Sequence, residues 1–466
     1  MTGTGKHVVV VGGGISGLCT AFLLRKKGFR ITLFEKDAAV GGTMKSIQHE
    51  GWLIESGPNS ALETTPLLRE ISDELGILDQ WMYADDASSK RYIVKNGRLH
   101  ALPSGIGSFL STPLWSFGGK LRLLKEPFIG KARREESIAE FVTRRLGKEF
   151  LDYAINPFVA GVYAGSPEKL SVQSAFPKLY ALEEKYGGLI KGAIRSRNER
   201  KKRKETAKDR ARLFSFERGM QTLPDALGRS LGDSVHLSTA VDRITPMRTG
   251  DHPTYFITTV RNGVQSTVEA DAVVLSVPSF GAAPIIRPID PETASSLESI
   301  YYPPVAEVFL GFRRDQIHHP LDGFGFLVPE IEHRKVLGCL WSSSLFPERA
   351  PESRIALTSF VGGSRQPDSV GGDDSTLLRD VLSDLADLVG ITGYPEFVRI
   401  VRWQQAIPQY NVGYHATLSK LDRFEKNFKG SFICANYRGG IAVGDCVMNA
   451  DKTAGAVENY FRTSLG

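Results

Sequence analysis

The chain has 466 residues, of which 41% are hydrophobic, 9% aromatic and 24% charged. It is long enough to bury a large core, and we expect two or three interleaved domains of a soluble enzyme. No run approaches the roughly 18 uninterrupted apolar residues of a membrane span, so a membrane-spanning helix is excluded.

The excess positive charge is concentrated in one segment. The chain has a net charge of +6, and residues 195–212 hold ten Lys or Arg against three acidic residues. Such a run is typical of a solvated, mobile loop or helix. The alternative is attraction to an anionic membrane, to which each basic residue contributes about 1 kcal/mol. No aromatic residues interleave with the charges, so we expect no nucleic-acid binding.

The four cysteines indicate neither a metal site nor a disulfide framework. Cys19, Cys339, Cys434 and Cys446 have neither spacing, which makes a reducing cytoplasm the expected compartment. The first predicted strand starts within seven residues, which leaves no room for a cleaved signal.

A buried strand near the start of the chain runs into a glycine-rich turn. Residues 8–11 are four valines, and Gly12, Gly14 and Gly17 follow. In this pattern the first glycine permits a tight turn, the second lets a phosphate approach the backbone, and the third lets a helix pack closely. The segment therefore predicts a cradle for a nucleotide pyrophosphate at a helix N-terminus.

The next elements agree with that cradle. We expect a helix over residues 18–27 and a second strand over 31–34, which ends at Glu35. This acid follows Gly17 by 18 residues, close to the roughly 20 expected for a carboxylate that binds a ribose hydroxyl.

The remaining pattern alternates between pieces of a nucleotide-binding sheet and insertions. Helices are expected at 66–78 and 223–231, a hairpin at 90–103 turning at Asn96-Gly97, strands at 235–237 and 271–278, a broken helical section at 104–191, and a β-rich section at 303–398.

Two early segments resemble the flavin-containing amine oxidases and their relatives. Residues 35–46 resemble the second glycine signature of that superfamily, and residues 51–60 resemble the segment beside its flavin. FAD is therefore expected rather than NAD. Thr43 stands where the superfamily usually has Arg or Lys, and Lys45 is the alternative source of that charge.

A narrower resemblance extends along nearly the whole chain. Its blocks lie at residues 90–92, 161–165, 323–329, 337–343, 359–363, 402–403 and 407–410. Together they resemble the oxygen-dependent, FAD-containing family of protoporphyrinogen and coproporphyrinogen III oxidases, which act in heme and chlorophyll synthesis.

The resemblance implies an α/β fold. A Rossmann-like FAD-binding domain is expected to be interleaved with a mixed-sheet substrate domain and a mostly helical insertion. The FAD-binding domain comprises residues 1–90, 213–300 and 399–466, the substrate domain 91–103 and 301–398, and the insertion 104–212, which ends in the basic loop and is expected near a membrane.

A porphyrinogen is a largely apolar tetrapyrrole with carboxylate arms, so its site needs apolar walls and a cation. By resemblance, Arg91 pairs with a propionate, Leu327 and Leu340 sandwich a pyrrole ring, and Phe360 stacks on it. Asn59 orients the macrocycle, and the carbonyls of Ala164 and Gly165 accept pyrrole N–H groups. The structural alternatives are sheet core for the apolar residues, an exposed arginine beside a hairpin, and turns elsewhere.

The cofactor residues follow in the same way. The resemblance implies contacts from Gly12, Gly13, Gly14, Ile15, Ser16, Gly17, Glu35, Lys36, Gly42, Thr43, Gly57, Pro58, Asn59, Ser60, Val241, Trp403, Ile441, Ala442 and Val443. One extra residue between Tyr437 and Asp445, relative to the family spacing, shifts the last three assignments by about one position.

The implied chemistry uses no metal and no protein nucleophile. A meso carbon gives a hydride to flavin N5, a pyrrole N–H loses a proton, and three rounds aromatise the macrocycle, with O2 reduced to hydrogen peroxide. His318 and His319 are expected in an exposed loop, and His415 has no partner identifiable from sequence, so the general base stays unassigned.

Several alternatives stay open. With Arg91 as the clear cation, protoporphyrinogen IX is preferred over coproporphyrinogen III. A flavin amine oxidase is the enzymatic rival, although it typically has paired aromatics where this chain has only Tyr437, and a noncatalytic FAD-binding scaffold is the third interpretation. Peripheral contact with the inner face of the cell membrane, a homodimer, and transfer of product to the next pathway enzyme are compatible with the resemblance.

Overall fold

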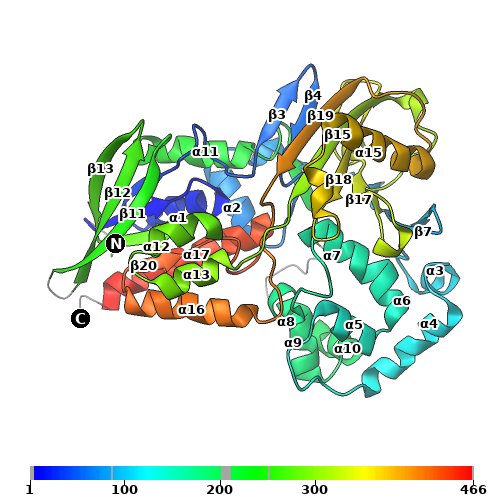
Figure 1. Cartoon of the computed structure of the whole chain (residues 1–466), viewed down its shortest axis with the longest axis horizontal. Coiled ribbons are helices and arrows are strands. Elements are labelled where there is room, and N and C mark those ends of the chain that lie inside the picture. Colours follow the sequence, from blue (N-terminus) through cyan, green and yellow to red (C-terminus); the bar gives the residue numbers. More distant parts are fainter. Residues whose placement is uncertain (1–4, 86–87, 201–210, 250–251, 464–466) are drawn as a thin grey trace.

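The computed structural model describes residues 5–85, 88–200, 211–249 and 252–463. Three lobes are visible: a nucleotide-binding lobe that holds both ends of the chain, a lobe around a seven-stranded sheet, and a helical lobe (Figure 1). Within the described ranges, no helix combines the length and the apolar character needed to cross a membrane.

A five-stranded parallel sheet forms the centre of the first lobe. Its order is β10-β2-β1-β14-β20. The strands are β1 (His7–Val11), β2 (Arg30–Phe34), β10 (Val235–His236), β14 (Ala272–Leu275) and β20 (Ser431–Ile433). Helices cover both faces, which explains why β1 is buried throughout. The Rossmann-like sheet expected from the sequence is thus confirmed.

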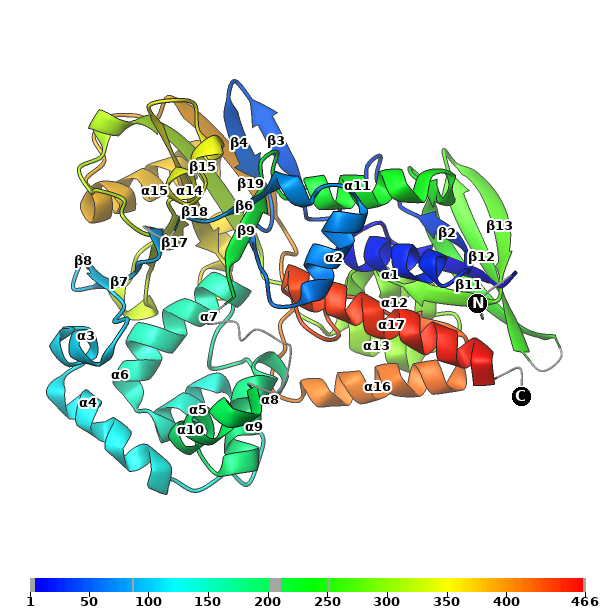
Figure 2. The ribbon, with the colours of Figure 1, turned by 180° about the vertical axis from the view of Figure 1, so that it is seen from behind.

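Alternate residues of these strands face two different helical layers. Val8 and Val10 pack in the same apolar cluster as α1 (Ile15–Lys26), α2 (Pro66–Glu74), α11 (Thr222–Leu231) and α17 (Val443–Thr463). Val9 and Val11 share a cluster with α12 (Ser279–Ile286), α13 (Pro291–Glu298) and α16 (Tyr414–Asn427). Figure 2 shows α17 lying alongside α1, although the two helices are separated by most of the sequence.

The described residues also form three smaller sheets. An antiparallel sheet contains β11 (Ala240–Thr249), β12 (His252–Arg261) and β13 (Val264–Ala270); a hairpin contains β3 (Ser46–His49) and β4 (Trp52–Glu55); a third sheet contains β5 (Ala61–Leu62), β9 (Leu213–Phe216) and β6 (Trp81–Tyr83). The β3–β4 hairpin stands between the first lobe and the seven-stranded sheet (Figure 2). There Trp52 packs on Phe309 and Phe397.

The seven-stranded sheet is mixed and has the order β19-β15-β18-β17-β16-β7-β8. Its strands are β7 (Arg91–Lys95), β8 (Arg98–Ala101), β15 (Val305–Arg313), β16 (Gly325–Leu327), β17 (Val336–Leu340), β18 (Arg354–Gly362) and β19 (Phe397–Trp403). The helix α15 (Asp374–Val389) packs on one face through Leu377, Val381 and Leu385. The predicted hairpin turn is confirmed, because Asn96 and Gly97 both have positive φ, +52° and +69°.

The helical lobe is built from the middle of the chain. It contains α3 (Ile106–Ser111), α4 (Phe117–Arg122), α5 (Ile138–Arg145), α6 (Lys148–Phe150), α7 (Asn156–Tyr163), α8 (Val172–Ala175), α9 (Pro177–Tyr186) and α10 (Leu189–Arg200); the short helix α14 (Ser342–Leu345) lies between β17 and β18. Arg145 is fully buried and pairs with Glu126 at 3.1 Å and Glu183 at 3.0 Å, so these charges are satisfied inside the lobe.

The structure shifts several predicted bounds. The helix expected over 66–78 ends at Glu74, and the one expected from residue 18 starts at Ile15. Most of the predicted basic run, residues 201–210, lies outside the described residues. Of its ends, Arg195 is exposed on α10 and the Arg212 guanidinium lies 3.5 Å from the centre of the Tyr83 ring. The predicted domain bounds stay a prediction.

Candidate functional site

The glycine turn after β1 has the geometry of a phosphate cradle. Gly12 has φ +107°, which favours glycine. A Cβ on Gly17 would lie 2.0 Å from the Gly12 carbonyl oxygen, so only glycine lets α1 pack this close to the turn. A Cβ on Gly14, in contrast, would meet no described atom within 4 Å, so the turn faces open space there. Ile15 and Ser16 begin α1, whose free N–H groups favour an anion.

Glu35 lies beside this turn at the end of β2. Its carboxylate is buried, and it accepts hydrogen bonds from the backbone N–H of Gly13 at 2.6 Å and of Asp37 at 2.9 Å. These bonds fix the acid at the edge of the cradle, where the sequence predicts a ribose. The neighbouring Lys36 is exposed.

The predicted cation after the second glycine signature is not free. Thr43 is exposed and Lys45 lies 3.7 Å from Asp37, so Lys45 is paired within the protein. The backbone around Thr43 has a packing role instead: a Cβ on Gly57 would lie 2.0 Å from the Thr43 carbonyl oxygen. Gly42 has φ +59°, and its Cβ would lie 3.3 Å from Gly14, which brings the two glycine segments together.

The segment of Gly57, Pro58, Asn59 and Ser60 is half-buried and is tied to the seven-stranded sheet. The Trp403 indole N–H at the end of β19 donates to the Ser56 carbonyl at 2.7 Å. The Asn59 side chain donates to the Gly57 carbonyl at 3.2 Å, so it stabilises this turn.

The C-terminal segment approaches the same region. Gly439 and Gly440 have φ of +104° and +123°, and α17 begins at Val443 after a half-buried Ile441 and an exposed Ala442. The first N–H groups of a helix have no acceptor within the helix, so those at the start of α17 would suit a polar ring edge. Val241 is half-buried at a bulge in β11 of the nucleotide lobe.

These residues fit a flavin dinucleotide. The open space at Gly14, the acid at the end of β2 and two helix N-termini supply what a pyrophosphate, a ribose and a ring carbonyl require.

The four predicted residues of the substrate wall share one face of the seven-stranded sheet. Leu340 on β17 is opposite Gly325, and Gly325 is opposite Arg91 on β7. Leu327 is opposite Gly338, which in turn is opposite Phe360 on β18. Directly opposed residues point to the same side of a sheet, so all four side chains lie on the face away from α15.

The apolar members of this face are only half-buried. Leu327, Leu340 and Phe360 keep exposed surface, whereas Phe326, Cys339 and Val361, which point to the other face, are buried under α15. The helix α7 covers part of the wall, because a Cβ on Gly161 would lie 2.6 Å from a methyl of Leu327.

Arg91 is an exposed cation at the edge of this face. Its guanidinium lies 5.4 Å from the centre of the Phe324 ring. Its neighbours on the strand are engaged elsewhere: Lys90 pairs with Asp322, and Lys95 donates to the carbonyls of Pro113 and Leu114. Arg91 therefore has donors to offer to an external carboxylate.

Ala164 and Gly165 directly follow α7, which ends at Tyr163. Ala164 has φ +49°, and its carbonyl accepts the N–H of Ser364 at 2.7 Å. A carbonyl keeps a second lone pair, so this bond leaves room for one more donor. A Cβ on Gly165 would lie 2.4 Å from the amide oxygen of Gln409, so a larger residue would clash there.

Glu307 was missed by the sequence reasoning and lies on the same face. It is opposite Phe360 on one side and Val401 on the other, in the buried centre of β15. Its Oε2 has no hydrogen-bond partner among the described residues, and burial, with a smaller effect from the charge of Glu55, holds the pKa of this carboxyl well above its usual range. The available signal was an acid inside the otherwise apolar run of residues 305–312.

One of the histidines differs from its predicted setting. His318 is exposed as expected, but His319 is not: it is half-buried against the rings of Tyr92 and Trp341, and burial lowers its pKa. His415 lies 3.5 Å from Glu135. In the part of the chain that the structure describes, no group of three or more His, Cys, Asp or Glu is arranged to hold a metal.

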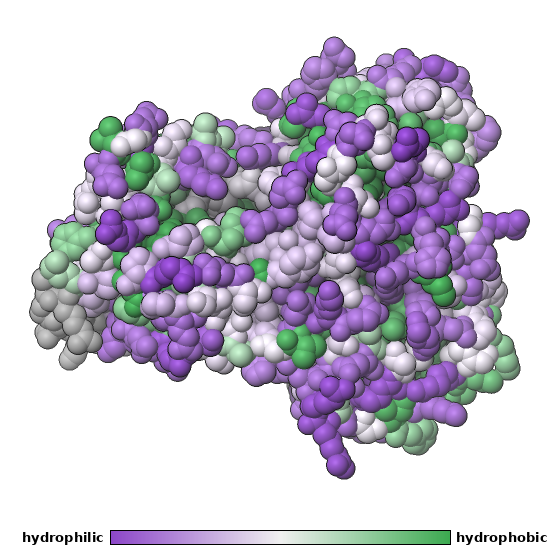
Figure 3. Space-filling model, viewed as in Figure 1, coloured by the Kyte–Doolittle hydropathy of each residue, from purple (hydrophilic) through white to green (hydrophobic). Residues whose placement is uncertain are grey.

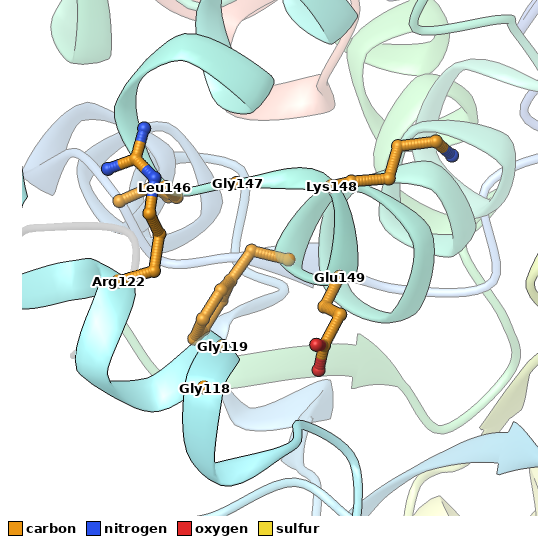
Figure 4. Close-up of a pocket in the computed structure, with 8 residues that line it drawn as sticks. Gly118, Gly119, Arg122, Leu146, Gly147, Lys148 and Glu149 are labelled. Atoms are coloured by element: carbon orange, nitrogen blue, oxygen red, sulfur yellow. The ribbon is translucent and has the colours of Figure 1, made fainter.

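A separate hollow of about 290 Å³ lies in the helical lobe, between α4 and the turn that leads into α6 (Figure 4). Glu149 at its edge accepts hydrogen bonds from the N–H and hydroxyl of Ser116, both at 2.6 Å. Its lining residues all lie outside the predicted substrate and cofactor sets.

Comparison with known proteins places this geometry among flavoenzymes. The model of the flavin-containing amine oxidoreductase family matches residues 15–457. Protoporphyrinogen oxidase 2 of Arabidopsis thaliana is 32% identical, over 99% of this chain and 95% of its own. Coproporphyrinogen III oxidase of Bacillus subtilis is 30% identical, over 95% and 96%. A crystal structure of an Exiguobacterium sp. protein, described there as a protoporphyrinogen oxidase, is 25% identical in sequence and aligns with a TM-score of 0.80. The alignment covers 98% of this chain and 99% of that one.

Proposed function

The chain belongs to the family of flavin-containing amine oxidoreductases, and on that premise we propose that it is an FAD-dependent oxidase that converts protoporphyrinogen IX to protoporphyrin IX. One observation carries the proposal: Leu327, Leu340 and Phe360 share a half-buried sheet face with the exposed cation Arg91. An apolar wall with a guanidinium at its edge suits a tetrapyrrole with carboxylate arms.

FAD is the flavin form that the nucleotide lobe suits. The cradle at Gly14 suits a pyrophosphate, and the fixed carboxylate of Glu35 suits the ribose of an adenosine. FMN has neither group, because it lacks the second phosphate and the adenosine. When bound, FAD supplies the hydride acceptor and returns the electrons to O2, giving hydrogen peroxide. Trp403, which connects β19 to Ser56, holds the sheet face against the segment expected beside the ring.

The choice between substrates depends on the number of propionates that the site pairs. Protoporphyrinogen IX has two and coproporphyrinogen III has four. Arg91 is an exposed cation on this part of β7, where the neighbouring Lys90 is already paired with Asp322. We therefore favour protoporphyrinogen IX as the substrate. Oxidation of coproporphyrinogen III is the alternative, because protoporphyrinogen oxidases and coproporphyrinogen III oxidases are both among the similar proteins.

We also propose that the helical lobe rests on the anionic inner face of the cell membrane. Six large apolar side chains of α3, α4 and the turn after α4 are exposed, and we call them the apolar strip: Ile106, Leu110, Phe117, Leu121, Leu124 and Phe128. Phe128 is 88% exposed and Ile106 is 82% exposed. Figure 3 shows hydrophobic surface at the lower right of the molecule, the region where Figure 1 places α3 and α4.

Cations flank the apolar strip. Lys125, Lys131 and Arg133 lie near it in sequence and are also exposed. Apolar side chains flanked by cations are typical of interfacial helices.

The central test is porphyrin formation by the FAD-loaded protein. Each porphyrinogen is supplied separately, and porphyrin fluorescence and hydrogen peroxide are followed against an enzyme-free control for autoxidation. We expect turnover of both substrates to be measurable and kcat/KM to be higher for protoporphyrinogen IX. A preference for coproporphyrinogen III would reverse the substrate assignment.

Two further outcomes would overturn the proposal itself. Peroxide from a polyamine panel, without porphyrin formation, would identify an amine oxidase. Tight FAD binding with no turnover on either class would identify a binding scaffold. Tyr437, the aromatic residue before α17, is fully buried, so it offers no ring to an amine at the flavin.

A further inference from the structure

Glu307 is a buried acid that the proposed reaction does not use. Along β15, Ala306, Val308, Leu310 and Phe312 point into the core under α15. Glu307 points the other way, between Val305 and Phe309, which pack in two separate apolar clusters. It is 6% exposed, and no described residue hydrogen-bonds its Oε2. An unpartnered buried carboxyl costs free energy, so its retention needs a reason.

The described surroundings of Glu307 leave it without a neutralising charge. Its neighbours across the strands are Phe360 and Val401. The charged group that faces it is Glu55 at the end of β4, and Glu55 is already satisfied by Arg349 at 2.9 Å, the Ser46 hydroxyl at 2.5 Å and the Met220 N–H at 2.9 Å. Because the Arg349 guanidinium is paired with Glu55, it does not neutralise a charge on Glu307.

The position of Glu307 points to a ligand. Two neighbours of Glu307 connect it to the predicted flavin segment. Glu55 is followed in the chain by Ser56 and residues 57–60. Val401 lies two residues before Trp403, whose indole N–H donates to the Ser56 carbonyl. Glu307 therefore lies beside Phe360 of the substrate wall, and it faces Glu55, the residue from which the chain continues into the predicted flavin segment.

We propose that Glu307 is held as a neutral carboxylic acid and donates a hydrogen bond to an acceptor on the bound flavin ring. The inference rests on the proposed function only for the place of the flavin. A neutral acid is the form that burial favours, and it offers the O–H donor that an imine nitrogen or carbonyl of the ring accepts. Glu307 binds and tunes the ring, and it is distinct from the backbone donors at α17.

The test is the absorption spectrum of bound FAD as a function of pH. Loss of the Glu307 proton replaces a donor by a negative charge beside the ring, so we expect the wild-type spectrum to shift in one protonation step. The shift should vanish in Glu307→Gln, which keeps an N–H donor, and in Glu307→Leu. Glu396→Gln, which removes a carboxylate paired with Arg354 at the start of β19, is the matched control and should retain the shift.

A second readout separates the two replacements. A donor to the ring stabilises its electron-rich reduced form, so Glu307→Leu should lower the flavin midpoint potential and weaken FAD binding about tenfold, the loss of roughly one hydrogen bond. Glu307→Gln should stay close to wild type in both, and because it nearly matches Glu in size it keeps the test valid if Glu307→Leu fails to fold.

Failure of the Glu307 role and failure of the proposed function give different results. A pH-independent wild-type spectrum, or an equal shift in Glu307→Leu, would overturn the role of Glu307 even if porphyrinogen is oxidised. A shift that depends on Glu307 would support it even if the substrate proves to be different.

Discussion

Gly14 and Gly17 belong to one motif but have opposite physical roles. Gly14 has φ −73° and faces open space, whereas Gly17 is in contact with the backbone of Gly12. We expect Gly14→Ala to leave the free energy of unfolding of the FAD-free protein nearly unchanged and to weaken FAD binding, since the methyl enters the cradle. Gly17→Ala should destabilise even the FAD-free protein, by about 1–3 kcal/mol, through overpacking.

Denaturant unfolding of both FAD-free variants and FAD titration by fluorescence measure the two effects. Equal destabilisation by the two substitutions would contradict this division.

Arg91 makes a separate prediction about substrate binding. Replacing its guanidinium in Arg91→Met removes a charge-assisted bond of about 1.5–3 kcal/mol, so KM for the porphyrinogen should rise about 10- to 100-fold, with little change in kcat. Steady-state fluorescence assays measure both constants. Arg98→Met, at an exposed position on the neighbouring strand β8, is the control and should leave KM unchanged. An equal effect of both substitutions would indicate a general loss of positive charge instead of a specific pair.

Among single residues, the sequence predicted the local geometry of those whose place depends on backbone spacing. The glycines and Glu35 could be placed because the turn and strand geometry follow from local chemistry. Glu307 could not, because its significance depends on β18, β19 and β4, which come from distant parts of the chain. The pairing of Lys45 with Asp37 likewise required the folded backbone.

Among the elements, α3 and α4 carry the clearest surface prediction. Replacing Ile106, Phe117 and Phe128 of the apolar strip with Ser should reduce co-sedimentation with anionic vesicles, because each removes apolar area from the lipid contact. Raised salt should weaken binding further by screening the flanking cations. Replacement of Val264 and Met247, exposed apolar residues of the nucleotide lobe, is the control and should have no effect. Undiminished sedimentation of the triple variant at high salt would exclude the strip.

Elements with strong local signals were predicted well, and those without them were not. The turn at Asn96-Gly97 has its own chemistry, and the valine run of β1 has no alternative to a buried strand. The section 104–191 contains many Pro and Gly residues, its helices are short, and the buried Arg145 of α5 is paired with the distant Glu126 and Glu183. Tertiary contacts, rather than local periodicity, set their bounds.

For the whole molecule, the buried acid Glu307 gives a pH dependence of stability. Its folded-state pKa is raised, so its contribution is fully present below its unfolded pKa, about 4.3, and is lost as pH rises toward the folded value. In FAD-free protein, wild type should therefore lose stability relative to Glu307→Gln by up to about 1.4 kcal/mol per pH unit across that window. Urea unfolding of both proteins from about pH 4.5 upward measures the difference, and a constant gap would mean that Glu307 titrates normally.

The strand order of the five-stranded sheet determines when each strand can find its partner during synthesis of the chain. β1 leaves the ribosome first, but its neighbour β14 is completed only at residue 275, and β20, at the sheet edge, at residue 433. At about 5–20 residues per second, one edge of the nascent valine strand stays unpaired for on the order of 10 to 50 seconds, until β14 is complete, and the sheet waits on the order of 20 to 80 seconds for β20. During these intervals the unpaired strand edges invite aggregation, so a chaperone that shields emerging chains should raise the yield of the native enzyme.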